Sequence, residues 1–169
     1  QYTGEGSRID LSMFESSVSW LTVPITLTAS FGKKITRRGN THEFFCPVSV
    51  YQTRNGFIYL AVGNDRQWKA LVSQAAFKKL DKPEYEKNAG RIEDVDNLND
   101  AMNAITNQMQ SEDLMDLLHS ITVPVSKIKS LEDVIQDPLV SQKLLSAKDP
   151  ITSQRITLAP PPIVTSHLE

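Results

Sequence analysis

The sequence predicts an α+β domain, in which a small and mostly antiparallel sheet is surrounded by helices. The first observation is a hairpin signal at Asn55-Gly56, because both residues tolerate the positive φ angles of a tight turn. Apolar side chains occupy alternate positions around this turn, at Val48, Val50, Ile58, Leu60 and Val62. The second observation is a series of apolar stripes at helical spacing before and after the hairpin. Together they favour one small sheet with helices packed against it.

The helix that follows the hairpin is expected to begin after Asn64. Asparagine is a favoured N-cap residue, and Gln67 lies three positions later, where its side chain can reach back to the cap. Capping explains these polar residues with fewer assumptions than an anion site at the helix N-terminus. The helix is expected to end near Phe77 and to bury Trp68, Leu71, Val72 and Ala75.

The chain is expected to comprise three segments. Residues 1–32 would form a linker strand and helix, residues 33–162 a small α+β domain, and residues 163–169 the start of a C-terminal linker. The boundary at residue 162 follows from the three prolines at 160–162, which stiffen an extended segment.

A long helix is expected in the first segment. Its apolar stripe recurs at helical spacing through Leu11, Phe14, Val18, Leu21 and Ile25. Residues 16–32 carry no charge, but they are rich in serine and threonine and their apolar residues form one stripe. We therefore expect a core helix kinked near Pro24 rather than a membrane span.

Two further helices are expected in the middle of the chain, one capped by Asp96 or Asn97 and one beginning at Ser111. Residues 78–90 before them are charged and contain a proline, which indicates a surface connection with a short helix at most. The buried faces of the two helices are expected to comprise Leu98, Met102, Ile105, Met109, Leu114, Leu117 and Leu118.

The last third of the chain is expected to hold short strands and short helices. Residues 121–125 and 154–158 are rich in residues that favour strands. Ser130 begins a capping box, and Asp137-Pro138 combines an N-cap residue with proline at the first helical position.

Composition argues against several classes of function. The net charge is −2 with acids and bases interspersed, so we expect neither a nucleic-acid nor a membrane partner. Cys46 is the single cysteine, which excludes an internal disulfide and suits a reducing, cytoplasmic compartment. Because Phe45 and Pro47 flank it, we interpret it as a packed side chain, since a nucleophilic thiol needs a base and an electropositive setting.

The best candidate for a functional site is the basic loop RRGNTH. The guanidinium groups of Arg37 and Arg38 can pair with carboxylates through two parallel hydrogen bonds. Gly39 permits close approach of the backbone, Asn40 or backbone amides could stabilise an oxyanion, and His42 completes the segment. This chemistry suits carboxylate and thioester substrates. The alternative is a solvated basic turn whose glycine merely reverses the chain.

Neither a metal site nor a complete catalytic set is expected. His42, His119 and His167 lie far apart in the sequence and lack the spacing of metal ligands. His119 lies near the end of an expected helix, where a cation is favourable, so a capping role is the simplest interpretation.

Four segments, in this order, resemble the second half of family III CoA-transferases, which include formyl-CoA transferase, carnitine CoA-transferase and α-methylacyl-CoA racemase. They are GEGSRIDLSMFES at residues 4–16, RRGN at 37–40 before the hairpin, AVGNDRQW at 61–68, and VPVSKIKSLEDVIQDP at 123–138. Each motif is weak alone, but their order and spacing are specific. Residues 85–109 add little to the resemblance.

The resemblance implies the small domain of this family, which lies over the active site of an interlocked homodimer. It implies coenzyme A and acyl-CoA as substrates, no covalently bound cofactor, and a catalytic aspartate upstream of residue 4. Asp10 matches the helix-entry aspartate instead, so we expect it to cap or support the helix. We therefore expect this chain to lack the N-terminal catalytic and CoA-binding domain, with which the small domain would associate. We also expect it to be inactive alone. The RRGNTH loop has one glycine and two arginines where some members carry a mobile glycine-rich loop.

Three functions stay open on the sequence. The leading expectation is a CoA-transferase that moves coenzyme A between an acyl-CoA thioester and a carboxylic acid, with Arg37 and Arg38 favouring an acceptor that has a second carboxylate. An α-methylacyl-CoA racemase-like enzyme would also place its acid and base upstream. A stand-alone binding module would fit the absence of a catalytic set.

Overall fold

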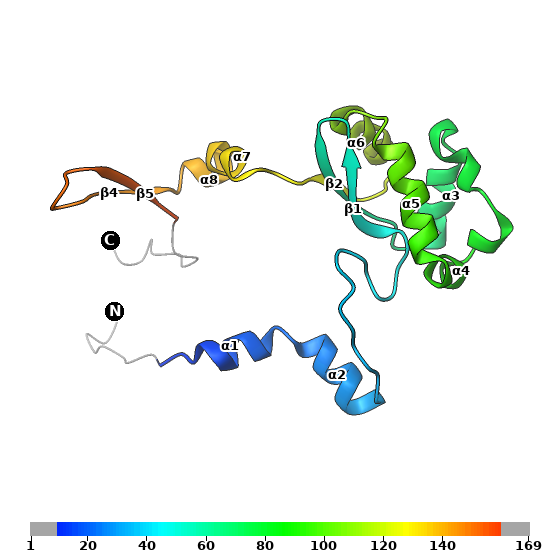
Figure 1. Ribbon diagram of the computed structural model, residues 1–169, viewed down its shortest axis with the longest axis horizontal. Coiled ribbons are helices and arrows are strands. Elements are labelled where there is room, and N and C mark those ends of the chain that lie inside the picture. Colours follow the sequence, from blue (N-terminus) through cyan, green and yellow to red (C-terminus); the bar gives the residue numbers. More distant parts are fainter. Residues whose placement is uncertain (1–9, 160–169) are drawn as a thin grey trace, which may run out of the picture. The chain divides into compact units, whose positions relative to one another are not determined.

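The computed structural model describes residues 10–159, and the chain divides into two compact units, Gln1–Gly39 and Asn40–Glu169 (Figure 1). Helices dominate, and the strands form two small antiparallel sheets. The predicted α+β class is therefore confirmed. The expected C-terminal linker, the prolines at 160–162 and His167 lie outside the described residues.

In the first unit, two helices, α1 (Met13–Ser19) and α2 (Thr22–Phe31), replace the single kinked helix that the sequence predicts. The break falls at Trp20 and Leu21, ahead of Pro24. Pro24 is the third residue of α2, where a backbone amide has no intrahelical partner, so the proline removes no hydrogen bond. No residue of either helix is buried, so the expectation of a core helix is wrong.

The ends of these helices carry standard local signals. The Ser12 hydroxyl accepts a hydrogen bond from the Glu15 amide at 3.3 Å, so Ser12 and not Asp10 is the N-cap of α1, and a supporting role for Asp10 stays a prediction. Gly32 ends α2 with φ +63°, and the amides of Gly32 and Lys33 donate to the last carbonyls of the helix. A left-handed glycine at this position is a common helix terminator.

The second unit is built around a three-stranded antiparallel sheet in the order β1-β2-β3. β1 (Val48–Thr53) and β2 (Gly56–Ala61) form the predicted hairpin, and β3 (Val125–Lys127) pairs with β2. Ile58 and Leu60 are buried as expected, but Tyr51 rather than Val50 is the buried residue opposite Ile58. Because side chains alternate along a strand, this register turns Val50 to the other face.

Helix α3 (Asp65–Val72) begins after Asn64, whose Oδ1 accepts the Gln67 amide at 2.9 Å, as predicted. The Gln67 side chain reaches back to the amide of Gly63 at 2.8 Å instead of to the cap itself. Trp68, Leu71 and Val72 are buried as expected. The helix ends at Val72 and not near Phe77, because a 3₁₀ helix, η1 (Ala75–Leu80), follows; this turn buries Phe77 and leaves Ala75 exposed.

The charged stretch 78–90 contains more structure than a surface connection. It includes the end of η1, the 3₁₀ helix η2 (Pro83–Tyr85) and the start of α4 (Asn88–Glu93). Leu80 and Tyr85 are buried there. Apolar residues in this stretch are few and irregularly spaced, so periodicity alone could not identify them as core residues.

Helices α5 (Val95–Thr106) and α6 (Ser111–Ser120) match the two helices expected in the middle of the chain. Asp94 precedes α5, so the cap expected at Asp96 or Asn97 lies inside the helix. The predicted buried residues Leu98, Met102, Ile105, Leu114 and Leu118 are all buried, whereas Leu117 is half-buried and Met109 lies beyond the end of α5.

The core of the second unit lies between the sheet and these helices. α5 contacts β1 and α6 contacts β2 (Figure 1). α6 also contacts β3, and α3 contacts η1. The Asn103 side chain of α5 accepts the Gln52 amide at 3.1 Å, which satisfies a backbone donor on the edge strand β1. The buried apolar cluster comprises Cys46, Tyr51, Ile58, Leu60, Val62, Trp68, Leu71, Val72, Phe77, Leu80, Tyr85, Leu98, Met102, Ile105, Leu114, Leu118 and Val123.

The C-terminal part contains helices α7 (Leu131–Gln136) and α8 (Pro138–Ser141), then a hairpin of β4 (Leu145–Lys148) and β5 (Arg155–Leu158). The capping box at Ser130 and the Asp137 cap are present as predicted. β5 was expected, whereas β4 was not. The strand expected at 121–125 lies at Val125–Lys127, because a turn with Thr122 at φ +58° follows α6.

Candidate functional site

The two arginines of the RRGNTH loop lie in the first unit. Arg37 and Arg38 are exposed in an irregular segment after α2. Gly39 adopts φ +62°, and an added Cβ would meet no atom within 4 Å. Glycine is therefore favoured here by backbone conformation rather than by lack of space.

The remaining residues of the loop lie in the second unit, where His42 is tightly held. Asn40 is exposed in the turn, and the His42 amide donates to the Val48 carbonyl at 3.2 Å. The His42 ring nitrogen Nδ1 accepts the Phe44 amide at 3.0 Å. The ring stacks on Phe45, with centroids 5.3 Å apart and planes inclined by 29°. The hydrogen bond to Nδ1 and the stacking on Phe45 thus orient an exposed imidazole.

Asn88, the first residue of α4, holds the backbone next to this histidine. Its Nδ2 donates to the Phe44 carbonyl at 2.7 Å, and its Oδ1 accepts the Cys46 amide at 3.1 Å. The Asn88 backbone amide in turn donates to Asp65 at 3.0 Å. One side-chain amide therefore satisfies the peptide groups on both sides of Phe45, in a segment without regular strand pairing.

Arg91 binds the same backbone segment through the Cys46 carbonyl. Its guanidinium is fully buried, donates to the Cys46 carbonyl at 2.6 Å and the Tyr85 carbonyl at 2.8 Å, and pairs with Asp65 at 2.9 Å. It also lies 5.1 Å from the centre of the Trp68 ring, within cation–π range. The hydrogen bond from Arg91 holds the pKa of Asp65 below its usual range.

Cys46 does not have the properties of a nucleophile. The thiol is buried, and burial raises its pKa to about 11, so it is protonated at neutral pH. The interpretation of Cys46 as a packed side chain is therefore confirmed. His119 is exposed in the last turn of α6, in agreement with its expected place near a helix end.

The sequence alone did not identify Asn88 and Arg91 as functional residues. Both lie within residues 85–109, which add little to the family resemblance. Gly90, between them, offered one signal, since glycine inside a helix is costly without a packing reason. A Cβ on Gly90 would lie 1.9 Å from the Glu84 carbonyl oxygen. The close approach of α4 to η2 thus requires glycine, in the helix from which Asn88 and Arg91 bind Phe44 and Cys46.

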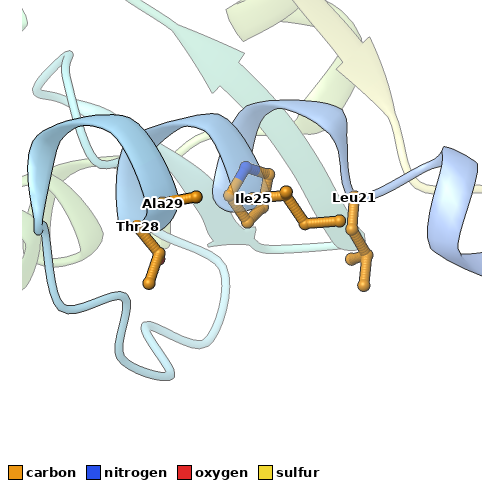
Figure 2. Close-up of a pocket in the computed structure, with 5 residues that line it drawn as sticks. Leu21, Ile25, Thr28 and Ala29 are labelled. Carbon is orange, nitrogen blue, oxygen red and sulfur yellow. The ribbon is translucent and has the colours of Figure 1, made fainter.

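Apolar hollows lie outside this cluster. One of about 310 Å³ is formed along one side of α2 by Leu21, Pro24, Ile25, Thr28 and Ala29 (Figure 2). Another of about 650 Å³ lies between α7, α8 and β5. The α2 hollow contains no ionisable side chain, so it offers a contact surface and no acid–base chemistry.

Between residues 10 and 159, no group of three or more His, Cys, Asp or Glu side chains is arranged to hold a metal ion. Over the same described range, no helix is both long enough and apolar enough to cross a membrane.

Comparison with known proteins gives a consistent family. The sequence model of CoA-transferase family III matches residues 1–160. Acetyl-CoA:oxalate CoA-transferase of Acetobacter aceti is 26% identical over 147 residues, covering 86% of this chain and 38% of that protein. Succinyl-CoA:mesaconate CoA-transferase of Haloarcula marismortui is 29% identical over 146 residues, covering 86% and 36%. Succinate–glutarate CoA-transferase of Agrobacterium fabrum is 28% identical over 142 residues, covering 83% and 36%.

Solved structures agree with the sequence comparison. The crystal structure of a CaiB/BaiF family protein from Brucella suis has a TM-score of 0.73 and 26% identity, covering 98% of this chain and 43% of that one. A Mycobacterium tuberculosis protein, Rv3272, shares the fold with a TM-score of 0.65 at 12% identity, covering 92% and 40%. The chain thus spans less than half the length of the relatives that it matches.

Proposed function

This chain belongs to CoA-transferase family III, and from that membership we propose that it forms part of an enzyme that moves coenzyme A between an acyl-CoA thioester and a carboxylic acid. The observation that carries the proposal is the family match over residues 1–160. The curated relatives named above support it, because each is named as a CoA-transferase.

We propose a dicarboxylic acid as the acceptor. Oxalate, mesaconate, succinate and glutarate, in the names of the relatives, all have two carboxylates. One carboxylate must be the site of thioester formation, which leaves the second as a recognition group. Arg37 and Arg38 are adjacent in the sequence, and a guanidinium group is suited to binding that second carboxylate.

This chain would contribute the small domain over the active site, with Arg37, Arg38, Gly39, Asn40 and His42 next to the acyl group. We propose that the nucleophilic aspartate of the enzyme lies in the part of the relatives' length that this chain does not match. We therefore propose that the chain needs a region matching the rest of its relatives' length, in an interlocked homodimer. The buried thiol of Cys46 is compatible with a reducing, cytoplasmic compartment.

The test compares residues 1–169 with the polypeptide that contains them, expressed at its full coding length. Each is incubated with succinyl-CoA and either glutarate, mesaconate or oxalate, and the new thioester is measured by chromatography. We expect turnover only from the full-length polypeptide. Turnover by residues 1–169 alone would refute the proposal that this chain needs a further region for activity. Racemisation of a 2-methylacyl-CoA without an acceptor acid would identify a racemase instead.

The role of the arginines is tested in the full-length polypeptide. The variant R37A/R38A is expected to raise the KM for a dicarboxylate acceptor about 10- to 100-fold, as expected when charge-assisted hydrogen bonds are removed. The KM for a monocarboxylate should change much less. K34A removes an exposed cation from the same segment and is the matched control. Equal effects on both acceptor classes would contradict a role in recognising the second carboxylate.

A further inference from the structure

We propose that His42 donates a hydrogen bond from Nε2 to an oxygen of the acyl-CoA or carboxylate substrate, and that Asn88 is the positioning residue that fixes this imidazole. The inference rests on the proposed function, since it assigns an atom and a supporting residue within the same site. The RRGNTH motif does not show which nitrogen of His42 is the donor. It also does not include Asn88, which lies more than forty positions further along the chain.

The hydrogen bond from Phe44 determines which nitrogen of His42 is the donor. A backbone amide can only donate, so Nδ1 of His42, which lies 3.0 Å from the Phe44 nitrogen, must present its lone pair. The neutral ring then has its proton on Nε2. His42 as a residue is exposed. A neutral donor of this kind suits a thioester carbonyl or a developing oxyanion.

Asn88 fixes the two contacts that orient the ring. By binding the Phe44 carbonyl and the Cys46 amide, it immobilises the peptide groups on both sides of Phe45. Phe45 is the ring on which His42 stacks, and Phe44 provides the amide that binds Nδ1. Arg91 holds the Cys46 carbonyl and Asp65 holds the Asn88 amide, so the support is anchored in the core.

The first experiment tests the positioning without any enzymatic activity. In residues 1–169 labelled with ¹⁵N, the coupling across the Phe44 N–H to His42 Nδ1 hydrogen bond and the exchange rate of the Phe44 amide are measured by NMR. Asn88→Ala should abolish the coupling and accelerate exchange at least tenfold. Asn103→Ala removes an asparagine that accepts a different backbone amide, that of Gln52, and should change neither. Retention of the coupling in Asn88→Ala would overturn the positioning role.

A second variant guards against loss of folding. Asn88→Asp keeps an acceptor for the Cys46 amide and removes the donor to the Phe44 carbonyl. It should weaken the coupling to His42 while the amide spectrum of the sheet stays unchanged. An unchanged Phe44 amide in this variant would show that the Asn88 donor does not control the ring, and would also count against the proposal.

The second experiment uses the full-length polypeptide and a double-mutant cycle. His42→Ala should lower kcat/KM about 100-fold, the loss typical of a removed oxyanion donor. Asn88→Ala should lower it about 10- to 100-fold, and the double variant should be no worse than His42→Ala. His42→Gln, which keeps an N–H donor, should recover part of the activity. Additive losses, or full activity in His42→Ala, would refute the proposal. A polypeptide without CoA transfer would refute the proposed function, while the NMR result would still decide the positioning.

Discussion

Helices α2 and α5 are of similar length and both contain large apolar side chains, yet α5 buries Leu98, Met102 and Ile105 whereas α2 buries no residue. Within its own unit, α5 packs against strand β1 of the three-stranded sheet. Burial of a leucine side chain stabilises a fold by roughly 1.5–3 kcal/mol. The two helices therefore differ greatly in the stabilisation that they gain from burial. Local pattern determines that a helix forms, and tertiary contact determines what it contributes to stability.

The largest effect is expected at Arg91, which links the backbone at Cys46 to Asp65 and Tyr85 in the second unit. Arg91→Ala removes the buried partner of Asp65 and leaves the Cys46 and Tyr85 carbonyls without their donors. We expect a loss of about 3–5 kcal/mol in the free energy of unfolding, measured by urea denaturation. Lys78→Ala breaks an exposed ion pair with Asp81 and should cost less than about 1 kcal/mol. Equal losses of unfolding free energy in the Arg91→Ala and Lys78→Ala variants would show that the buried contacts of Arg91 do not stabilise the fold.

The second prediction tests the contrast between the helices directly. Leu98→Ala removes a fully buried side chain from α5 and should cost about 2–5 kcal/mol. Leu21→Ala removes the same atoms from a side chain that is 49% exposed next to α2, and should change stability by at most about 0.5 kcal/mol. Urea denaturation followed by tryptophan fluorescence measures both. A cost above about 2 kcal/mol for Leu21→Ala would mean that this side chain is buried in solution.

The third prediction compares two helix caps of the same kind. Asn64→Ala removes the acceptor for the Gln67 amide in α3, which is packed in the core, and should cost about 1 kcal/mol of global stability. Ser12→Ala removes the corresponding acceptor in α1. Because α1 buries no residue, we expect a small loss of helical circular dichroism and an unchanged unfolding midpoint. A lowered midpoint in Ser12→Ala would show that α1 is coupled to global folding.

The smallest effect is expected from pH, at the contact between the hairpin turn and α6. Hydrogen bonds from Lys127 and then Asn55 lower the pKa of Glu112 to about 2. Because this folded-state pKa lies below the ordinary value of 4.5, the contribution of Glu112 is fully present above that pH and is lost as the pH falls toward 2. The Tm advantage of the wild type over Glu112→Gln should therefore shrink from pH 6 to pH 2.

Asp113→Asn is the control for this pH series, since it removes a negative charge from the same first turn of α6. The Tm difference between the wild type and Glu112→Gln should depend on pH if the ion pair of Glu112 with Lys127 causes it. A constant difference over the whole pH range would contradict this cause.

Residues that act through their neighbours in the chain could be predicted from the sequence. The turn at Asn55-Gly56, the cap at Asn64, the capping box at Ser130 and the Asp137 cap are all found as expected. Each depends on hydrogen bonds or dihedral preferences within a few residues, which the sequence states directly. The order of four sequence segments, at 4–16, 37–40, 61–68 and 123–138, also identified the family, and the family sequence model agrees.

Features that depend on residues far apart in the chain could not be predicted. Tyr51 replaced Val50 on the inner face because strand register is set by pairing with Ile58, not by apolar alternation in β1 alone. The single helix expected around Pro24 is two helices without buried residues. The RRGNTH loop could be identified as a candidate, but its role in binding stays a prediction.

By itself, then, the sequence determined the local elements, their caps and turns, and the family to which the chain belongs. Only the tertiary structure decided that Asn88 and Arg91 support the backbone beside His42, and that this ring is held by Phe44 and Phe45. The physical reason is separation along the chain. Asn88 meets Phe44 across 44 positions, and such a contact exists only after the sheet and helices have packed.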